Sequence, residues 1–532
     1  MIAPRQPRIR QANDRSPNTS GQFVLYWMQM FRRLHANHAL DHALQLCREW
    51  GKPLVVYEGL KLNYPWASDR HHTFILQGMR DNAEAAKRLG VSYWPFVETP
   101  SDPGHGLLKK LAARACAIVT DDYPAFITPA HNRAIANRCD IPVILVDSNS
   151  IVPLSLLGEP VPSAAVLRRR IHKLFVEAWN NRARNEPDVP KSASSQIDPP
   201  FNPWNPQQDI ASFIAKLPID HSVPAVSSVA GGSGAGQALL NQFIAHKLPR
   251  YSQERNYPTD PARSAASGLS AHLHHGHLAI QQVVEAALGT GWTPAEINWR
   301  VQGQRNNFLC SNPNVNEFLD EAITWRDVGY QWHWSRYASR TAMLSSATNQ
   351  SWSTNTWPQF NFETFDFSPG GERTLDAVLP AWAQTTLRNH EADRREYLYE
   401  LDQFEAADTH DPLWNAAQRE LVFTGRIHNY LRMLWGKKVI EWTKTPAEAY
   451  AVLEHLNNKY ALDGRDPNSY TGILWCFGLF DRPWYPERAI FGTIRYMSSE
   501  NTARKFKLSG YLEYVARVVA EAQNLTTNPQ GS

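Results

Sequence analysis

The sequence lacks several features that would place it in a common class. Its cysteines are scattered without a CxxC pair, which argues against a disulfide framework or a cysteine-based zinc site and favours free thiols in a reducing compartment. No apolar run approaches the roughly 20 residues that span a bilayer. The N-terminal region also has no signal-peptide core. We therefore expect no membrane contact, and a location in the cytoplasm, or in the nucleus if the source is eukaryotic.

An excess of charge of one sign is also missing. The 54 Lys and Arg residues nearly balance the 51 Asp and Glu residues, for a net charge of +3. Any DNA-binding surface must therefore come from local clustering of basic side chains. Tryptophan is abundant by contrast, with 19 residues. A large aromatic core or a role in stacking and electron transfer would each explain this number, and only the positions can decide.

Two motif look-alikes are rejected. The run AGGSGAGQ at 230–237 has no third glycine for GxGxxG and no lysine for a phosphate-binding loop, so we interpret it as a flexible helix entry. The run HLHHGH at 272–277 offers no carboxylate or cysteine nearby as a further ligand, and we expect no metal there.

The sequence predicts an α/β part followed by an all-helical part. Residues 1–21 are polar and are predicted to be a disordered arm. Apolar β-branched runs alternate with helical segments such as 38–50 and 71–89, which is typical of a doubly wound, Rossmann-like parallel sheet. The five predicted strands are 23–26, 53–57, 91–97, 117–120 and 141–146.

Two polar stretches interrupt the sequence after the predicted sheet. The Pro/Ser/Asn-rich run 186–206 is typical of an exposed linker, and helical patterns such as 427–443 and 445–460 dominate after about residue 208. The run 341–373 is rich in Ser, Thr and Asn and is predicted to be a long loop or insertion. The predicted organisation is an α/β domain at 22–155, a linker at 156–207 and a helical domain at 208–525.

Five blocks of sequence resemble signature blocks of the class II cyclobutane pyrimidine dimer photolyases, within the photolyase/cryptochrome family. The blocks are THDPLWNAAQRELVFTGRIHNYLRMLWGKKVIEW from Thr409, LNNKYALDGRDPNSYTGILW from Leu456, FGTIRYM from Phe491, GLSAHLHHG from Gly268 and FLDEAITWRD from Phe318. Together they cover most of residues 250–520. The resemblance implies an α/β antenna domain and an all-α FAD-binding catalytic domain.

The resemblance also implies an activity, that of a deoxyribodipyrimidine photo-lyase, a carbon–carbon lyase. Reduced FAD would absorb near-ultraviolet or blue light, directly or through an antenna chromophore such as a deazaflavin or a folate. It would pass an electron to a cyclobutane pyrimidine dimer flipped out of ultraviolet-damaged DNA, and the electron would return after the dimer splits. We expect a monomer that acts on DNA, at the nucleoid in a prokaryote.

A flavin needs a cation beside its reduced ring, amide partners, and donors for its pyrophosphate. The resemblance implies that Arg432 and Asp463 pair beside the ring and that Asn457 lies near its N5 atom, with Asn468 and Ser469 as alternatives. The remaining predicted FAD contacts are Asn429, one helical turn before Arg432, and Tyr251, Ser267, Leu269 and Ser270, which precede or open a helix. An ordinary buried ion pair is the competing interpretation of Arg432 and Asp463.

The resemblance implies an electron relay from the surface to oxidised flavin, formed by three tryptophans of the family blocks. Trp435 and Trp442 are seven residues apart and so share a helix face, and Trp414 lies on the preceding segment. Simple core packing is the competing interpretation.

The predicted dimer pocket draws on separate segments. Glu321 and Trp325 are four apart on a predicted helix, while Met433 and Trp475 would add apolar walls. A flipped dimer needs flat partners for its rings and a hydrogen-bond partner for its edges, and a protonated Glu321 could donate to a dimer carbonyl. Glu321 could instead be a simple surface carboxylate. The predicted DNA contacts are Arg255, Lys437, Arg482 and Arg495.

Residues 29–31 and 36–38 depart from the family pattern after the first strand, which weakens the expectation of an antenna pocket. Three other functions stay open. A cryptochrome-like photoreceptor often carries a C-terminal tail, and the end of this chain at Ser532 favours repair instead. Repair of six-four photoproducts would draw on pocket histidines, such as those at 272–277. A flavin protein without DNA would have a neutral or acidic face around the pocket.

Overall fold

The computed structural model describes residues 6–344, 361–362, 365–366, 375 and 378–527. Its contacts divide the chain into two compact units. The first unit comprises Met1–His246 and Gly268–Asn349, and the second comprises Lys247–Ser267 and Gln350–Ser532. The first unit therefore combines the sheet with residues 208–246 and 268–349, which the sequence assigns to the helical domain. Ion pairs and hydrogen bonds such as Arg168–Asp320 and Ser150–Asp327 connect the two parts of the first unit.

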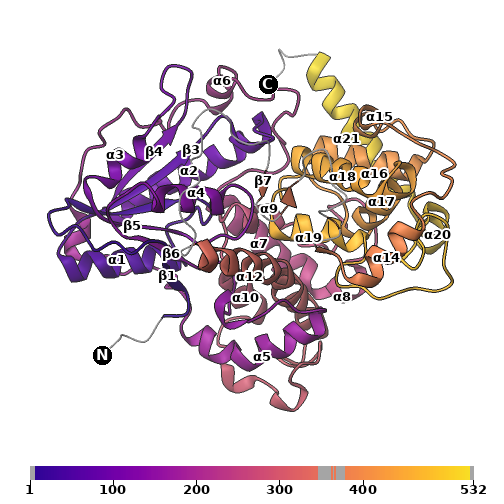
Figure 1. Cartoon of the computed structure of the whole chain (residues 1–532), viewed down its shortest axis with the longest axis horizontal. Coiled ribbons are helices and arrows are strands. Elements are labelled where there is room, and N and C mark those ends of the chain that lie inside the picture. The colour runs from indigo at the N-terminus through magenta and orange to yellow at the C-terminus, as the bar shows by residue number, and fades with distance from the viewer. Residues whose placement is uncertain (1–5, 345–360, 363–364, 367–374, 376–377, 528–532) are drawn as a thin grey trace. The chain divides into compact units, whose positions relative to one another are not determined.

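The first unit contains a six-stranded sheet in the order β1-β6-β5-β2-β3-β4 (Figure 1). All neighbouring strands are parallel except β1, which is antiparallel to β6. The prediction of a doubly wound parallel sheet is therefore confirmed. The strands are β1 (Ile9–Gln11), β2 (Phe23–Met28), β3 (Leu54–Leu60), β4 (Ser92–Val97), β5 (Ala115–Asp121) and β6 (Val143–Val146).

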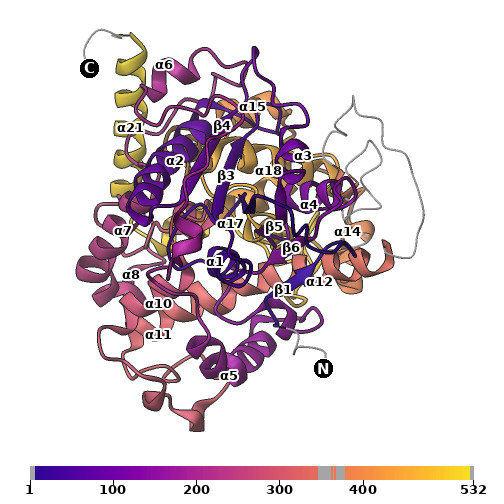
Figure 2. The ribbon, with the colours of Figure 1, turned by 90° about the vertical axis from the view of Figure 1, so that its left-hand side faces the viewer.

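Alternate residues of β2 supply two different cores, because successive side chains of a strand point to opposite faces. Phe23, Leu25 and Trp27 pack in one cluster with residues of α3 (Leu107–Ala112) and α4 (Thr128–Ala136). The intervening residues pack with α1 (His38–Trp50) and with the end of α2 (Asp69–Leu89). In Figure 2 the strands β3 and β4 run between α2 on one side and α3 with α4 on the other. Burial on both faces explains why every residue of β2 is buried.

Part of the predicted disordered arm is ordered in the structure. Residues 9–11 form the edge strand β1, paired with β6. The guanidinium of Arg10 binds both carboxylate oxygens of buried Asp122 at 2.6 and 2.7 Å, and Arg8 donates to the carbonyls of Asp147 and Ser150 at 3.1 Å. These long-range partners fix a segment whose polar composition alone predicts disorder.

The predicted linker also packs against the first unit. It contains α5 (Ala164–Asn180), and its Pro-rich part is bonded to β4: the indole of Trp94 donates to the carbonyl of Ile197 at 3.0 Å. Further helices of this unit include α6 (Ile210–Ile214), α7 (Ser233–Gln242), α9 (Ser270–His274), α10 (Ile280–Leu288), α11 (Pro313–Leu319), a π-helix (Asp320–Trp325) and α12 (Arg326–Leu344).

The second unit is helical apart from the short pair β7 (Asn361–Phe362) and β8 (Phe365–Asp366), as far as the structure describes it. Its helices are α8 (Tyr251–Glu254), α14 (Ala381–Asn389), α15 (Leu401–Ala406), α16 (Pro412–Thr424), α17 (Asn429–Trp442), α18 (Pro446–Tyr460), α19 (Pro467–Cys476), α20 (Ser499–Lys505) and α21 (Ser509–Thr527). The two helices predicted at 427–443 and 445–460 are confirmed as α17 and α18. Most of the predicted insertion at 341–373 lies outside the described residues.

Helix boundaries of the second unit follow from local capping. The carboxylate of Asp411 accepts hydrogen bonds from the backbone N–H groups of Leu413 and Trp414 at 3.0 Å, which starts α16. Gly425 ends this helix at a φ of 69°. Within the described ranges, no helix combines the length and apolarity that crossing a membrane requires.

Candidate functional site

The second unit brings Arg432 and Asp463 together, as the sequence predicts. A guanidinium nitrogen (Nη2) of Arg432 on α17 lies 3.1 Å from Oδ1 of Asp463, which follows α18. The two side chains are 28% and 16% exposed. The Nε atom of Arg432 is buried and has no hydrogen-bond partner among the described residues. A half-buried cation whose Nε donor is buried and unpaired fits an acceptor atom of a flavin ring, so these residues suit the cofactor that the sequence implies.

The loop that carries Asp463 is held from several sides. The N–H of Leu462 donates to the carbonyl of Gly425 at 2.8 Å, and the Ser469 hydroxyl donates to the carbonyl of Asp463 at 2.8 Å. A Cβ atom at Gly464 would lie 2.9 Å from two carbonyl oxygens, so the turn has no room for a side chain. Ser469 therefore supports the Asp463 loop.

Asn457 is buried on α18, at 3% exposure. Its amide nitrogen donates to the side-chain oxygen of Asn458 at 3.2 Å. The same oxygen accepts the backbone N–H of Arg465 at 2.8 Å. Asn458 thus connects the helix of Asn457 to the Asp463 loop, and this supporting residue was missed by the sequence reasoning. Asn468 donates its backbone N–H to Asp466 at the start of α19.

The other predicted FAD contacts are divided between the two units. Tyr251 is buried at 7% exposure on α8, and Ser267 ends the same segment of the second unit. Asn429 is exposed at the first residue of α17. Leu269 and Ser270 belong to the first unit, where Ser270 opens α9. Their binding of FAD stays a prediction.

The three predicted relay tryptophans are buried and in contact. Trp414 lies 6.5 Å from Trp435, with the rings nearly parallel at 7°, and 5.8 Å from Trp442 in an edge contact. The indole of Trp414 donates to the carbonyl of Trp435 at 3.0 Å, and that of Trp435 donates to the side chain of Gln418 at 2.9 Å. Trp414 is therefore the middle member of the group, and the hydrogen bonds fix both ring orientations.

Aromatic contacts continue beyond Trp442. Its ring lies 5.6 Å from Tyr399 and 5.0 Å from His410. His410 stacks at 3.7 Å on Tyr397, which is 40% exposed. A path of touching rings thus leads from buried Trp435 to the surface of the second unit. Its outer members were not predicted from the sequence, although His410 lies inside the block that begins at Thr409 and Tyr397 and Tyr399 lie shortly before it.

Glu321 and Trp325 lie in the π-helix, where the sequence predicts an ordinary helix. Both side chains are half-buried. A π-helix has more residues per turn than an α-helix, so residues four apart still share a face. Short π segments inside helices occur frequently at functional sites. Glu321 also lies 3.6 Å from Arg305, a residue that the sequence reasoning did not single out.

Met433 on α17 and Trp475 on α19 are half-buried on two helices that pack closely. A Cβ atom at Gly436 would lie 2.7 Å from Sγ of Cys476, so glycine permits this approach. The ammonium of Lys437 donates to the carbonyl of Cys476 and is 1% exposed. The prediction that Lys437 contacts DNA is therefore wrong. Its ammonium lies between packed helices and is not available to a DNA phosphate. Burial lowers the pKa of Lys437 from 10.5 to about 8.

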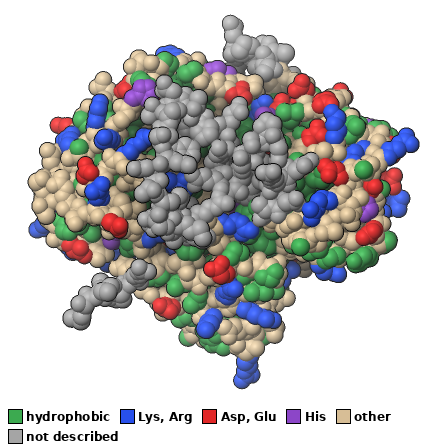
Figure 3. All heavy atoms as spheres, viewed as in Figure 1, with side chains coloured by type: hydrophobic (Ala, Val, Ile, Leu, Met, Phe, Trp, Pro, Cys, Tyr) green, Lys and Arg blue, Asp and Glu red, His purple; other side chains and the backbone are tan. Residues whose placement is uncertain are grey.

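The other predicted DNA contacts of the second unit lie nearer the surface. Arg482 and Arg495 both stack on Trp484, with guanidinium carbons 4.6 and 4.2 Å from the ring centre. Arg495 also pairs with Asp481 at 3.2 Å. Arg255 lies 5.6 Å from the ring of Tyr251. On the face shown in Figure 3, Lys and Arg are interspersed with Asp and Glu, so any attraction to DNA must be local.

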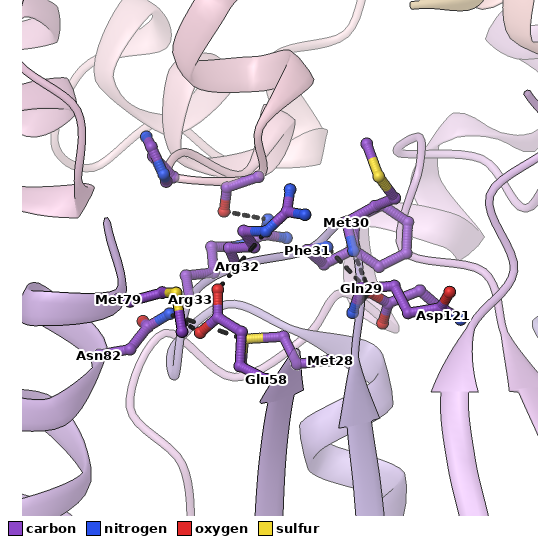
Figure 4. Close-up of polar contacts among 12 residues, drawn as sticks. Met28, Gln29, Met30, Phe31, Arg32, Arg33, Glu58, Met79, Asn82 and Asp121 are labelled. Atoms are coloured by element: carbon purple, nitrogen blue, oxygen red, sulfur yellow. Dashed lines mark hydrogen bonds and ion pairs between the residues drawn. The ribbon is translucent and has the colours of Figure 1, made fainter. Parts of the chain in front are cut away.

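The carboxyl ends of β2 and β5 form the point where strand order reverses, which is the usual ligand crevice of such sheets. There, Asp121 accepts the backbone N–H groups of Gln29, Met30 and Phe31 at 3.0, 2.7 and 2.9 Å (Figure 4). Burial raises the pKa of Asp121, and these three donors oppose the rise. The donors of this crevice are thus already used by a side chain of the protein.

The histidines of the 272–277 run are buried in the first unit. His272, His275 and His277 surround Phe74, with ring centres 4.9 to 5.2 Å away. Burial lowers the pKa of His272 to about 4, so it is neutral near pH 7. Nδ1 of His277 accepts the backbone N–H of Gly232, which ties the run to the entry of α7.

The α/β unit and the helical unit, with its Arg432–Asp463 pair and buried tryptophans, fit a two-part flavoprotein, and comparisons with known proteins identify the family. The chain is 32% identical to a deoxyribodipyrimidine photo-lyase of Methanothermobacter thermautotrophicus, over 97% of this chain and 99% of that protein. It is 30% identical to photo-lyases of Potorous tridactylus and Arabidopsis thaliana, over 92% and 93% of this chain and 80% and 89% of those proteins. The chain belongs to the deoxyribodipyrimidine photo-lyase family.

Solved structures support the fold. A bacterial class III photolyase from Agrobacterium tumefaciens superposes with a TM-score of 0.57 at 15% identity, over 95% of this chain and 88% of that one. A cryptochrome of Synechocystis gives a TM-score of 0.58 at 15% identity, over 92% and 88%. No protein-family model matches the sequence. The predictions of a photolyase enzyme and of this fold are confirmed, and family membership implies a flavin cofactor.

Proposed function

We propose that this protein is a class II photolyase that repairs cyclobutane pyrimidine dimers in DNA with light. The observation that carries the proposal is the Arg432–Asp463 pair, whose spare buried donor fits a flavin, in a chain about 30% identical to photo-lyases over most of its length. Reduced FAD, when bound, would be the electron donor that light excites.

The residues of the second unit hold and tune that cofactor. Arg432 stabilises negative charge on the flavin ring, and Asp463 orients its guanidinium. Asn457 offers an amide to the ring edge, while Asn429, Tyr251 and Ser267 are proposed contacts to the rest of the cofactor, as are Leu269 and Ser270 of the first unit. Trp435, Trp414 and Trp442 would return the resting protein to its reduced state by passing electrons inward.

Other residues bind the damaged DNA. Glu321 would bond the polar edge of the flipped dimer, and Trp325, Trp475 and Met433 would contact its rings. Arg255, Arg482 and Arg495 would contact phosphates. We expect a monomer in the cytoplasm, or in the nucleus if eukaryotic. The proposal needs no antenna chromophore, and the Asp121 contacts argue against a deazaflavin or folate on the N–H groups of residues 29–31.

The test is illumination of the chemically reduced protein with an oligonucleotide that contains one dimer. Repair is expected under blue or near-ultraviolet light and not in the dark, and Glu321→Ala should lower its yield while FAD stays bound. A flavin-loaded protein that repairs no dimer would contradict the proposal and favour the photoreceptor function. Repair of six-four photoproducts in place of dimers would reassign the substrate.

A further inference from the structure

Arg305 bridges the acidic groups around Glu321. Its guanidinium lies 3.1 Å from the carboxylate of Glu317, 3.5 Å from that of Asp320 and 3.6 Å from that of Glu321. It comes from the loop that precedes α11, while the three carboxylates lie on α11 and on the π-helix that follows. One cation therefore faces three acids that are close in sequence.

The loop that carries Arg305 is anchored on both sides of that residue. The N–H of Gly303 donates to Nδ1 of His172 on α5 at 2.9 Å, and the ring of Phe308 stacks on the same imidazole at 3.6 Å. Gly303 has a φ of 83°, and a Cβ atom there would lie 2.5 Å from the Arg169 side chain. The backbone on each side of Arg305 is thus fixed before any substrate arrives, which limits the positions of its guanidinium.

The π-helix is anchored as well. Arg168 on α5 binds Asp320 through two hydrogen bonds of 2.6 and 2.8 Å, and both side chains are under 10% exposed. Bidentate pairs of this kind fix geometry as well as charge. Asp320 directly precedes Glu321, so α5 holds both the loop of Arg305 and the backbone of Glu321.

We propose that Arg305 is a positioning residue for Glu321, which it keeps ionised and directed by an ion pair. This inference rests on the proposed role of Glu321 in dimer binding. An ionised carboxylate can only accept hydrogen bonds, so Glu321 would meet a donor of the dimer, such as the N–H of a pyrimidine imide. Without Arg305, the neighbouring acids would raise the pKa of Glu321, so the protonated form, which donates where the carboxylate accepts, would persist to higher pH.

Charged and titratable groups of the first unit lie near this site. They include Arg305 on the loop, Glu317 on α11, Asp320 on the π-helix, and Arg168 and His172 on α5. Burial and Arg168 lower the pKa of His172 to about 4, so His172 is neutral above that pH. A titration above that pH that disappears when Glu321 is replaced would therefore belong to Glu321.

The experiment measures the protonation of Glu321 by infrared difference spectroscopy on the FAD-loaded protein, with Glu321→Gln to assign the carboxyl band. Arg305→Gln should move the titration midpoint upward by about one pH unit, the lower end of the effect of an opposite charge at this distance. Arg300→Gln removes an equal charge from the short 3₁₀ helix Trp299–Val301 just before that loop, and should leave the midpoint in place. The acid limb of dimer repair should shift by the same amount as the band.

An unchanged midpoint in Arg305→Gln would overturn the inference. If that variant does not fold, Arg305→Lys carries the test, because a lysine keeps the charge but cannot span three carboxylates, so a smaller upward shift is expected. No shift in the lysine variant would again overturn it. A wild-type protein that repairs no dimer would instead refute the proposed function, while the infrared midpoint would still decide the role of Arg305.

Discussion

Replacing Lys437 with methionine separates a structural lysine from a DNA contact. The pKa of Lys437 falls from 10.5 to about 8 because the group is buried. One pH unit corresponds to about 1.36 kcal/mol, so burial of this charge costs roughly 3 kcal/mol of stability below pH 8. Between pH 8 and 10.5 the unfolded chain still binds the proton while the folded protein does not, so the free energy of unfolding rises with pH in this window.

Methionine removes that penalty but leaves the carbonyl of Cys476 without its donor, a loss of about 1–3 kcal/mol. The variant should therefore be up to about 2 kcal/mol more stable than the wild type at pH 7 and less stable at pH 10.5. Urea unfolding at the two pH values measures this change, and Lys507→Met, at an exposed position, is the control. The affinity for dimer DNA should not change. A weaker affinity with a salt slope reduced by about one would refute the reasoning and restore Lys437 as a phosphate contact.

Three further predictions address function. Trp442→Phe should slow photoreduction of oxidised FAD, because phenylalanine keeps the bulk but is much harder to oxidise. Repair by chemically reduced protein should stay near normal. Unchanged photoreduction would mean that Trp442 only packs in the core. Arg495→Ala should weaken binding of dimer DNA and reduce its salt slope by about one, and binding measured at two salt concentrations tests this. Asp481 would lose its ion pair with Arg495 but keep the hydrogen bonds from the Arg482 backbone and the Trp484 indole. Arg432→Leu should weaken FAD retention roughly tenfold or more, since an ionic hydrogen bond contributes about 1.5–3 kcal/mol, and unchanged flavin occupancy would place the pair away from the cofactor.

The sheet could be predicted from sequence because its strands are buried on both faces. Such strands appear as short apolar runs between helical segments, and five of the six strands were found in this way. The strand at residues 9–11 was missed because its order depends on Arg8 and Arg10, whose partners lie more than 100 residues away. A polar composition predicts disorder only when those charges have no buried partner.

Some contacts of the candidate site could be predicted from the sequence and others could not. The Arg432–Asp463 pair and the Trp414 contacts follow from blocks of sequence that resemble a known family, and the structure confirms that these side chains meet. The burial of Lys437 could not be predicted, because a lysine beside a second lysine in an amphipathic helix is typical of a solvated face. Its position became internal because Gly436 lets α19 approach closely enough for the carbonyl of Cys476 to accept a hydrogen bond from the Lys437 ammonium.

The supporting residues of the site were invisible to the sequence for a different reason. Asn458, Arg168 and Arg305 act on their neighbours through partners that are distant in the chain or lie on another element, so spacing carries no signal of them. Their effect is nevertheless strong, since each holds a proposed functional group or its backbone in one place. A chain with the same family blocks but without Arg168 and Arg305, which lie outside them, would keep the recognisable motif and lose this part of the fixed geometry. The predicted shift in the Glu321 titration on removal of Arg305 is the measurable form of that difference.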